Sequence, residues 1–292
     1  MKARKFLYKK PSTIQEALEL LDKHGSRAKV VAGGTDLLVL MKERRVEMDY
    51  LIDLRKIQSL EGVRQENGSL VIGARCTHTF LSEDEVILKR LPILAQAAGT
   101  IGSRAIRNKG TVGGNLCNAS PAADTAVALL ALDAEVGLVS SQGRRLVALR
   151  DFLTGPNETI LKANEIMEHL KVPVPGPEAK GNFQKLGLST SGDGLYVVSV
   201  GVVLNLAAGN KMVKSAAIAL GNVAPTAIRT SEAEAFLAGK TISLGVIEET
   251  GRLAKEATRP KEEYPFLTEE YRRNMTEVLV WRAINQCVAG TV

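Results

Sequence analysis

The sequence predicts an α+β protein in two parts, and three observations lead to this prediction. Before residue 173, short stretches with helical spacing alternate with short β-prone stretches. Pro173, Pro175 and Pro177 then place three prolines within five residues, a density that neither a helix nor an interior strand tolerates. After the prolines, β-prone runs come first and helical segments follow. We therefore expect one domain over residues 1–175 and a second over residues 178–292.

The elements of the first part follow from local signals in the chain. Ser12 and Gln15 have the spacing of a capping box, which predicts a helix through Leu21 that Gly25 ends. In chain order, the remaining elements are expected as strands over 30–32, 50–54 and 69–73, helices over 92–98 and 122–132, and strands over 133–139 and 145–149. This part of the chain therefore mixes short helices with short strands.

The second part begins with strands and ends with helices. Strands are expected over 182–186, 195–206 and 212–220. Ser231 and Glu234 form a second predicted capping box. A helical segment follows over 244–257, and a final helix is predicted from residues that recur at helical spacing, namely Tyr271, Met275, Val278 and Leu279. The longest apolar stretch, 195–208, has 14 residues, which is too short to span a bilayer and suits a buried strand.

Composition permits a sizeable core and an anionic ligand. The chain has 292 residues, of which 45% are hydrophobic, and can therefore bury a substantial interior. Its 38 Lys and Arg residues exceed 32 Asp and Glu residues, and the net charge of +6 suits an anionic ligand or an acidic partner. Nucleic acid is the rival partner. The basic residues occur in scattered clusters, however, and only 4% of residues are aromatic, so we expect no nucleic-acid binding.

Cysteines and histidines give no sign of a metal site or of hydrolase chemistry. The three cysteines stand far apart without a CxxC motif, which argues against a disulfide framework, a zinc site and an all-cysteine iron–sulfur cluster. The three histidines are isolated from one another and from any nucleophile motif. These residues are Cys76, Cys117, Cys287, His24, His78 and His169. A reducing, cytoplasmic compartment is expected from this cysteine usage, and the N-terminus lacks the apolar core of a signal peptide.

Two glycine pairs carry the functional signal. Gly33 and Gly34 lie within 30–37, and Gly113 and Gly114 lie near the start of 111–121. In both segments, a short β-prone stretch runs into the glycines and small hydrogen-bonding residues follow, so backbone N–H groups can approach an anion without a Cβ in the way. Either pair alone is adequately explained as a turn. Two such segments together can hold one pyrophosphate from opposite sides.

The flanks of these pairs resemble a known family. Residues 30–37 and 101–115, with 119–124 after them, are similar to the FAD-binding medium subunit of the molybdenum hydroxylases, which include xanthine, carbon monoxide and nicotinate dehydrogenases. The resemblance covers essentially the whole chain, because residues 271–273 before the final helix also look like the family's C-terminal domain. It implies a two-subdomain FAD-binding domain of the vanillyl-alcohol oxidase (PCMH) type, followed by an α+β domain of the CO dehydrogenase flavoprotein type.

The resemblance also implies a set of FAD-binding residues. The glycines are expected to present backbone amides, the two threonines hydroxyl groups, and the asparagine its side-chain amide. Asp36 has an equally good alternative role as the cap of a helix that begins at Leu37. The expected cofactor-binding residues are Val30, Val31, Ala32, Gly33, Gly34, Thr35, Asp36, Leu37, Ile101, Thr111, Val112, Gly113, Gly114, Asn115, Asp124, Met167 and Lys185.

Four of these positions have individual roles in the family pattern. Asp124 stands where the family has an aspartate that binds the ribose, and its alternative role is a helix cap. Ile101 corresponds to a residue that packs on the adenine or the flavin. Met167 corresponds to a backbone contact to the flavin ring. Lys185 matches a lysine near the isoalloxazine edge, although a surface lysine on a strand is an equal alternative.

The chain departs from the family pattern at one position. Leu188 stands where many relatives carry arginine. The environment of the flavin face around Asp193 and Tyr196 is therefore left undefined by the resemblance.

The function implied by the resemblance is electron transfer through FAD, with no catalytic acid or base and no metal in this chain. Flavin accepts electrons one at a time from an iron–sulfur centre and releases them in pairs, which a nicotinamide cannot do. The implied partners are a small subunit with 2Fe-2S clusters and a large subunit with the molybdenum cofactor, arranged as a dimer of heterotrimers. Two alternatives are a stand-alone flavin reductase or oxidase and a non-enzymatic module without flavin. The substrate and the terminal electron acceptor are not specified.

Overall fold

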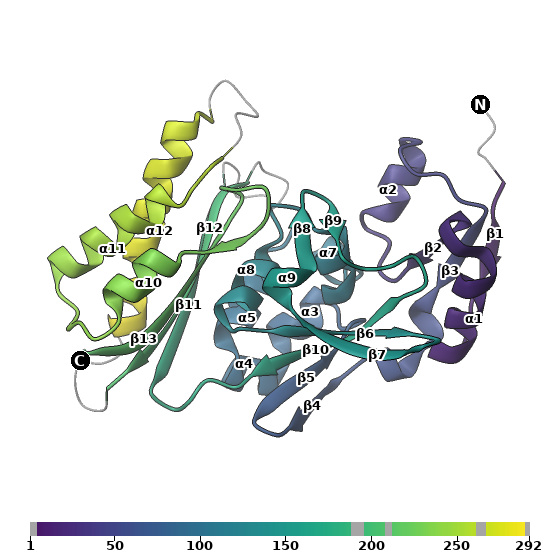
Figure 1. The fold of residues 1–292 in the computed structure, drawn as a ribbon, viewed down its shortest axis with the longest axis horizontal. Helices are drawn as coiled ribbons and strands as arrows, with labels where there is room; N and C mark the ends of the chain where they lie inside the picture. The colour runs from purple at the N-terminus through teal and green to yellow at the C-terminus, as the bar shows by residue number, and fades with distance from the viewer. Residues whose placement is uncertain (1–4, 188–195, 208–211, 261–266, 290–292) are drawn as a thin grey trace.

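Three β-sheets lie in a row along the long axis of the molecule (Figure 1). The computed structural model describes residues 5–187, 196–207, 212–260 and 267–289. A three-stranded sheet lies at the N-terminal end, a five-stranded sheet lies in the middle, and a four-stranded sheet with its helices lies at the C-terminal end. The predicted α+β class is confirmed.

The N-terminal sheet is parallel and has the strand order β1-β3-β2. Its helix α1 buries Ala17, Leu18 and Leu21 against the sheet, where they meet Ile52 in one apolar cluster. The elements here are β1 (Leu7–Lys9), α1 (Ile14–His24), β2 (Ala28–Val31), α2 (Leu37–Lys42) and β3 (Tyr50–Asp53), with 3-10 turns at Gly25–Arg27, Leu54–Lys56 and Gln58–Leu60.

The central sheet is antiparallel, with the order β4-β5-β10-β6-β7. Its strands are β4 (Val63–Glu66), β5 (Ser69–Gly73), β6 (Glu135–Ser140), β7 (Gly143–Ala148) and β10 (Ile166–Pro173), and a small hairpin joins β8 (Leu153–Gly155) to β9 (Glu158–Thr159). Its helices are α3 (His78–Glu83), α4 (Glu85–Arg90), α5 (Pro92–Gly99), α6 (Arg104–Arg107), α7 (Val112–Asn118), α8 (Asp124–Ala131) and α9 (Leu149–Phe152).

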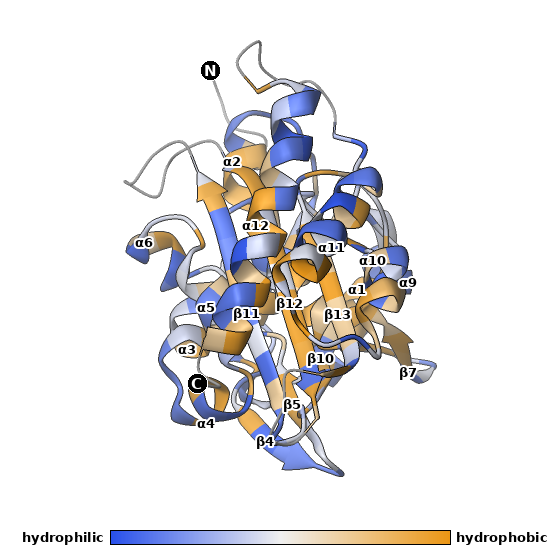
Figure 2. Cartoon of the chain, turned by 90° about the vertical axis from the view of Figure 1, so that its left-hand side faces the viewer, coloured by the Kyte–Doolittle hydropathy of each residue, from blue (hydrophilic) through white to orange (hydrophobic). Residues whose placement is uncertain are grey.

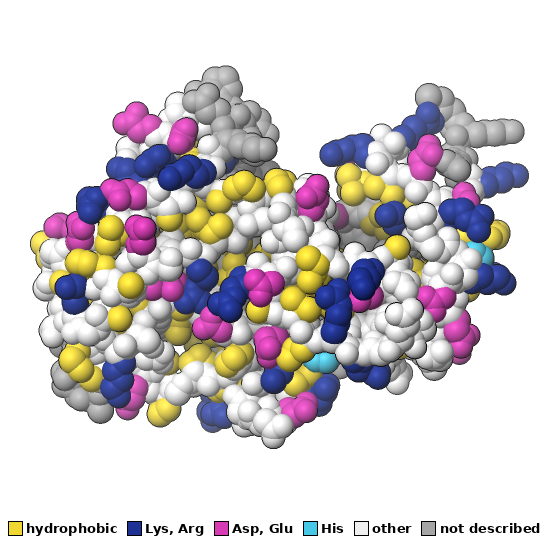
Figure 3. All heavy atoms as spheres, viewed as in Figure 1, with side chains coloured by type: hydrophobic (Ala, Val, Ile, Leu, Met, Phe, Trp, Pro, Cys, Tyr) yellow, Lys and Arg dark blue, Asp and Glu magenta, His cyan; other side chains and the backbone are white. Residues whose placement is uncertain are grey.

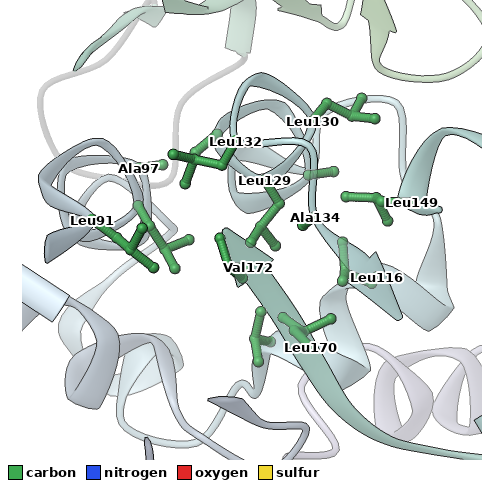
Figure 4. Packing of buried hydrophobic residues seen from close by; sticks show 14 of the residues in the cluster. Leu91, Ala97, Leu116, Leu129, Leu130, Leu132, Ala134, Leu149, Leu170 and Val172 are labelled. Carbon is green, nitrogen blue, oxygen red and sulfur yellow. The ribbon is translucent and has the colours of Figure 1, made fainter. Parts of the chain in front are cut away.

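The main core lies between the central sheet and the helices beside it. Val172 on β10 lies beside Leu129 on α8, and Leu170 and Leu91 belong to the same cluster (Figure 4). Every residue of α8 is buried. A helix without a polar face must be covered on all sides, so α8 is the shared centre of the molecule.

The C-terminal sheet covers the other side of α8. Its antiparallel strands are β11 (Ala179–Gly187), β12 (Tyr196–Leu206), β13 (Val213–Gly221) and β14 (Ile228–Arg229), and its outer face carries α10 (Ser231–Leu237), α11 (Leu244–Glu256) and α12 (Glu269–Ala289). Strands β12 and β13 are mostly apolar, whereas the helices turn polar faces outward (Figure 2). A Cβ on Gly221 would lie 2.5 Å from Val127 of α8, so glycine allows this sheet to pack closely on the helix.

The predicted helix starts need two corrections. Helix α1 is capped by Thr13 instead of Ser12, because the Thr13 hydroxyl accepts from the N–H of Glu16 and the Glu16 carboxylate accepts from Ser12. The second predicted capping box does not form, since Ser231 lies inside α10. Glu234 instead accepts the N–H of Ile218 and pairs with Arg229.

The predicted apolar stripe of the last helix is also displaced. Tyr271 is exposed, whereas the buried face of α12 includes Arg272, Thr276, Leu279 and Ala283. Of the predicted stripe, Tyr271 therefore faces solvent and Leu279 lies in the core. Among the described residues, no helix is both long and apolar enough to cross a membrane.

Candidate cofactor site

A cavity of about 550 Å³ lies between β2 and α2 on one side and α7 and the start of β10 on the other. The surface of the molecule is hollowed between α2 and the central sheet (Figure 3). This volume falls within the roughly 300–1,000 Å³ of small-molecule sites. All residues expected at the cofactor line the cavity except Val112, Asp124 and Lys185. The structure therefore brings the two glycine segments together.

The first glycine segment directly follows β2 and offers unpaired amide groups. The N–H groups of Gly33, Gly34, Thr35 and Asp36 have no hydrogen-bond partner among the described residues. Gly34 has a φ of 78°, a conformation that other residues rarely adopt. Consecutive free amides at the edge of a cavity can bind an anion, as the sequence predicts for this segment.

Gly33 is also the point where the two glycine segments touch. A Cβ at Gly33 would lie 2.1 Å from the carbonyl oxygen of Lys109 and 2.9 Å from Cα of Gly110. No side chain fits at that distance. Glycine at this position therefore allows the backbone of the second segment to close one wall of the cavity.

The second glycine pair differs from its prediction. Gly113 and Gly114 lie in the first turn of α7 and not in a loop after a strand. The N–H of Gly113 donates to the carbonyl of Ala74 at 2.9 Å, and that of Gly114 donates to the Thr111 hydroxyl at 3.1 Å. Both amides are thus used inside the protein, and they do not form the expected second half of an amide cradle.

The second segment contributes space and a side-chain donor instead. A Cβ on Gly114 would meet only Thr111 Oγ1 within 4 Å, at 2.9 Å, and would otherwise project into open space. Asn115 accepts a 2.6 Å hydrogen bond from the Thr125 hydroxyl on its Oδ1. Its Nδ2 has no partner in the described part of the chain and is free to donate into the cavity.

Asp36 does not cap its helix through its side chain, although it precedes α2. Its carboxylate instead accepts a 3.3 Å hydrogen bond from the hydroxyl of Thr35. Ile101 and Met167 supply apolar surface to the cavity, and Met167 lies at an irregular position of β10. Val112 is fully buried and belongs to the core beneath the cavity.

Asp124 and Lys185 pair with each other beside Thr100. Lys185 Nζ is hydrogen-bonded to Asp124 and donates to the carbonyl of Thr100 at 3.2 Å, and it lies 3.3 Å from the ring centroid of Tyr196. The two side chains are 8% and 4% exposed. Burial raises the pKa of Asp124 and lowers that of Lys185, and their mutual attraction opposes both shifts. The predicted positions Leu188 and Asp193 lie outside the described residues.

The cavity wall also contains polar residues that were not expected from the sequence, among them Arg75 and His78. The Arg75 guanidinium is held by the carbonyl of Ile57 at 2.9 Å and by Glu61 at 2.8 Å, while its Nε is enclosed without a partner. His78 is 2% exposed and also lines the cavity. Neither residue belongs to a motif, and only the fold brings them to the glycine segments.

The three cysteines are free, and no group of three or more His, Cys, Asp or Glu side chains in the described part of the chain is arranged to hold a metal ion. The polar groups of the cavity are mostly donors, which suits phosphate oxygens. Apolar surface beside these donors suits the ring system of a nucleotide cofactor. Fold and site thus define a two-part α+β protein whose cavity between the glycine segments suits a phosphate-bearing cofactor.

The comparisons with known proteins identify the family. Residues 4–175 match the FAD binding domain in molybdopterin dehydrogenase, and residues 190–287 match the CO dehydrogenase flavoprotein C-terminal domain. The chain belongs to the FAD-binding medium subunits of the molybdenum hydroxylases, as its resemblance predicts. It is an oxidoreductase subunit.

Relatives match the chain over almost its whole length. The carbon monoxide dehydrogenase medium chain of Hydrogenophaga pseudoflava is 34% identical over 96% of both chains. A xanthine dehydrogenase FAD-binding subunit of Escherichia coli O157:H7 is 29% identical over 97% of this chain and 96% of its own length. Quinoline 2-oxidoreductase of Pseudomonas putida 86 has a similar structure, with a TM-score of 0.92, 29% identity and coverage of 100% and 99% of the two chains.

Proposed function

We propose that this chain holds one FAD in the cavity between its glycine segments and passes electrons through it from a partner's 2Fe-2S clusters to a terminal acceptor. The observation that carries this proposal is the run of unpaired amides from Gly33 to Asp36, which shares one cavity with the Cβ-free surface of Gly114. Within the described residues, these amides otherwise lack partners. A cofactor diphosphate provides acceptors for them.

The cavity residues divide into donors and packing surfaces. The amides of the first segment and Nδ2 of Asn115 donate to the diphosphate, while Ile101 and Met167 pack against the ring systems. Bound FAD supplies a redox group that accepts single electrons and releases pairs. The chain itself binds and orients this group and needs no acid or base of its own.

Asp124 and Lys185 keep their predicted roles at the ribose and the flavin edge as part of the proposal. In the structure, Asp124 and Lys185 form an ion pair with each other. Neither residue lines the cavity. A direct contact with FAD therefore requires this pair to open or to share a further hydrogen bond. The proposed FAD domain covers residues 1–175, and the second domain covers 178–292.

The assembly we propose contains a small iron–sulfur subunit and a large molybdenum subunit, arranged as a dimer of heterotrimers in the cytoplasm. Relatives named as medium chains of carbon monoxide dehydrogenase support a multi-subunit complex. The three unpaired cysteines fit a reducing compartment.

Co-purification tests this function. A tagged chain should isolate an assembly with FAD, iron and molybdenum that oxidises a substrate, whereas the chain alone should carry only FAD and oxidise none. Complete substrate turnover by the isolated chain would contradict the proposal and favour the stand-alone flavoenzyme.

A further inference from the structure

His78 occupies a position that only the tertiary structure creates. It is the first residue of α3, directly after the cap residue Thr77. Its N–H donates to the carbonyl of Gly110 at 3.0 Å, and Thr77 forms an isolated antiparallel bridge with Thr111. This backbone pairing fixes His78 beside the second glycine segment.

The imidazole lies close to the junction of the two glycine segments. A Cβ on Gly110 would lie 3.1 Å from Cδ2 of His78 and 3.4 Å from its Nε2. On the other side, Cα of Gly110 lies 2.9 Å from the corresponding Cβ position of Gly33. Gly110 therefore separates the histidine ring from the unpaired amides of the first segment by the width of a single residue.

The ring has hydrogen-bonding capacity that the described protein residues do not use. His78 is 2% exposed, its Nδ1 is enclosed without a partner, and the ring lines the cavity. No hydrogen bond to either ring nitrogen occurs within the described residues. Since Nδ1 is enclosed, Nε2 is the nitrogen that a ligand can reach.

Burial and the nearby Arg107 lower the pKa of His78 to about 4. The ring is therefore neutral near pH 7 and carries its proton on one nitrogen. A proton on Nδ1 would leave a buried N–H without an acceptor. If the proton is on Nε2 instead, the enclosed Nδ1 carries only a lone pair. The Nε2–H group then points into the cavity.

We propose that His78 is a further cofactor-positioning residue, whose Nε2–H donates to a diphosphate oxygen of bound FAD. This inference rests on the proposed FAD site and adds a side-chain donor from α3. The amides of Gly33 to Asp36 bind the same diphosphate from the other segment. The donor compensates for the second glycine pair, whose amides are used within the protein.

Substitutions that imitate one ring nitrogen at a time test the proposal. The amide nitrogen of glutamine reaches about as far as Nε2, whereas that of asparagine reaches only as far as Nδ1. We expect His78→Gln to keep the FAD dissociation constant within about three-fold of the wild-type value. His78→Asn and His78→Leu should weaken FAD binding by roughly ten-fold or more, as expected for a lost hydrogen bond to a charged oxygen.

The measurement is FAD binding to the isolated chain by flavin fluorescence, with thermal unfolding of each apo variant as the folding control. Unchanged affinity in a folded His78→Leu variant overturns the proposal, as does better binding by His78→Asn than by His78→Gln. Absence of FAD binding to the wild-type chain would instead contradict the proposed function itself.

A measurement on the wild-type protein covers the case in which variants do not fold. With 15N-labelled histidine, adding FAD should yield one slowly exchanging imidazole signal from an Nε2–H group, and ADP should produce the same signal through its diphosphate. Absence of this signal in a saturated FAD complex would contradict the donor role.

Discussion

Gly33 and Gly114 both line the cavity, but the space around them differs. Gly33 has no room for a side chain because the backbone of Lys109 occupies that space. At Gly114, a Cβ would meet only Thr111 Oγ1, at 2.9 Å, so a small shift of that side chain would admit it. We therefore propose that the first glycine serves the fold of the protein and that the second serves cofactor binding.

Alanine substitutions should separate these two roles. In Gly114→Ala, the gain in helix propensity is about 1 kcal/mol and offsets a weakened Thr111 cap, which is worth about 0.5–2 kcal/mol. The unfolding free energy of the apo protein should thus change little, while FAD affinity falls at least ~10-fold. Urea unfolding and FAD titration check this pair of results.

Gly33→Ala is the matched comparison. Its Cβ overlaps the Lys109 carbonyl at 2.1 Å, so the segments must separate. We expect a loss of about 1–3 kcal/mol in unfolding free energy together with weaker FAD binding. Equal unfolding free energies of the two alanine variants would contradict the separate roles of Gly33 in the fold and Gly114 in cofactor binding.

At the scale of single elements, the sequence predicts strands better than helix ends. Strand β5 forms over Ser69–Gly73, as expected from its bounding turns. The start of α1 moves by one residue because Ser12 and Thr13 can both cap a helix, and only the backbone path selects Thr13. Helix α7 was not predicted, because a glycine pair disfavours helix, yet the Thr111 cap and the bond to Ala74 stabilise it.

The edge strand β1 depends on one buried carboxylate of β3. Asp53 accepts from the Tyr8 hydroxyl of β1 and from Arg55 Nη2 at 2.6 Å. Burial alone would raise the pKa of Asp53, but the hydrogen bonds from Arg55 and Tyr8 lower it to about 2. A carboxyl with a lowered pKa stabilises the folded state above its ordinary pKa of 3.8, and this contribution disappears as pH falls toward 2.

Asp53→Asn should therefore reduce stability at pH 7 by about 1–2 kcal/mol, a value limited by solvent screening at the exposed end of Arg55. The difference from wild type should vanish near pH 2. Urea unfolding at several pH values measures it, with the exposed Asp151→Asn as a control that stays near wild type. A difference that does not depend on pH would exclude the ionised carboxylate as its source.

At the scale of the whole molecule, α8 and the C-terminal sheet share one core and one buried ion pair. Asp124 begins α8, whereas Lys185 lies on β11, and each balances the other's charge away from water. Asp124 and Lys185 could each be matched to a position of the family pattern from the sequence. Their pairing could not be predicted from the sequence, since it depends on how the C-terminal sheet packs on α8.

Removing one partner of this ion pair should lower the free energy of unfolding. Lys185→Met leaves Asp124 buried without its cation, which typically destabilises a protein by about 3–5 kcal/mol. The double variant with Asp124→Asn should recover much of that loss. Urea unfolding of the two single variants and the double variant measures the coupling, and strictly additive losses would contradict a direct interaction.

The same variants test the predicted contact of Asp124 with the ribose. Asp124→Asn should weaken FAD more than FMN if the carboxylate binds the adenosine half of the cofactor. Equal effects on the two ligands would leave Asp124 with its structural role alone.

The family, the α+β class and the two glycine segments were accessible from the sequence because they depend on short contiguous motifs. His78 and Arg75 were not, since each reaches the cavity through backbone pairing between distant segments. The contribution of the second glycine pair also required the structure, because a hydrogen bond to Ala74 determines whether an amide is free.

Titration of the purified chain with FAD tests the central claim most directly. The account predicts saturation at one FAD per folded chain, with at least ~10-fold weaker binding in the equally stable Gly114→Ala variant. A folded wild-type chain that fails to bind FAD, or a Gly114→Ala variant that binds it as tightly as wild type, would contradict a cofactor site between the glycine segments.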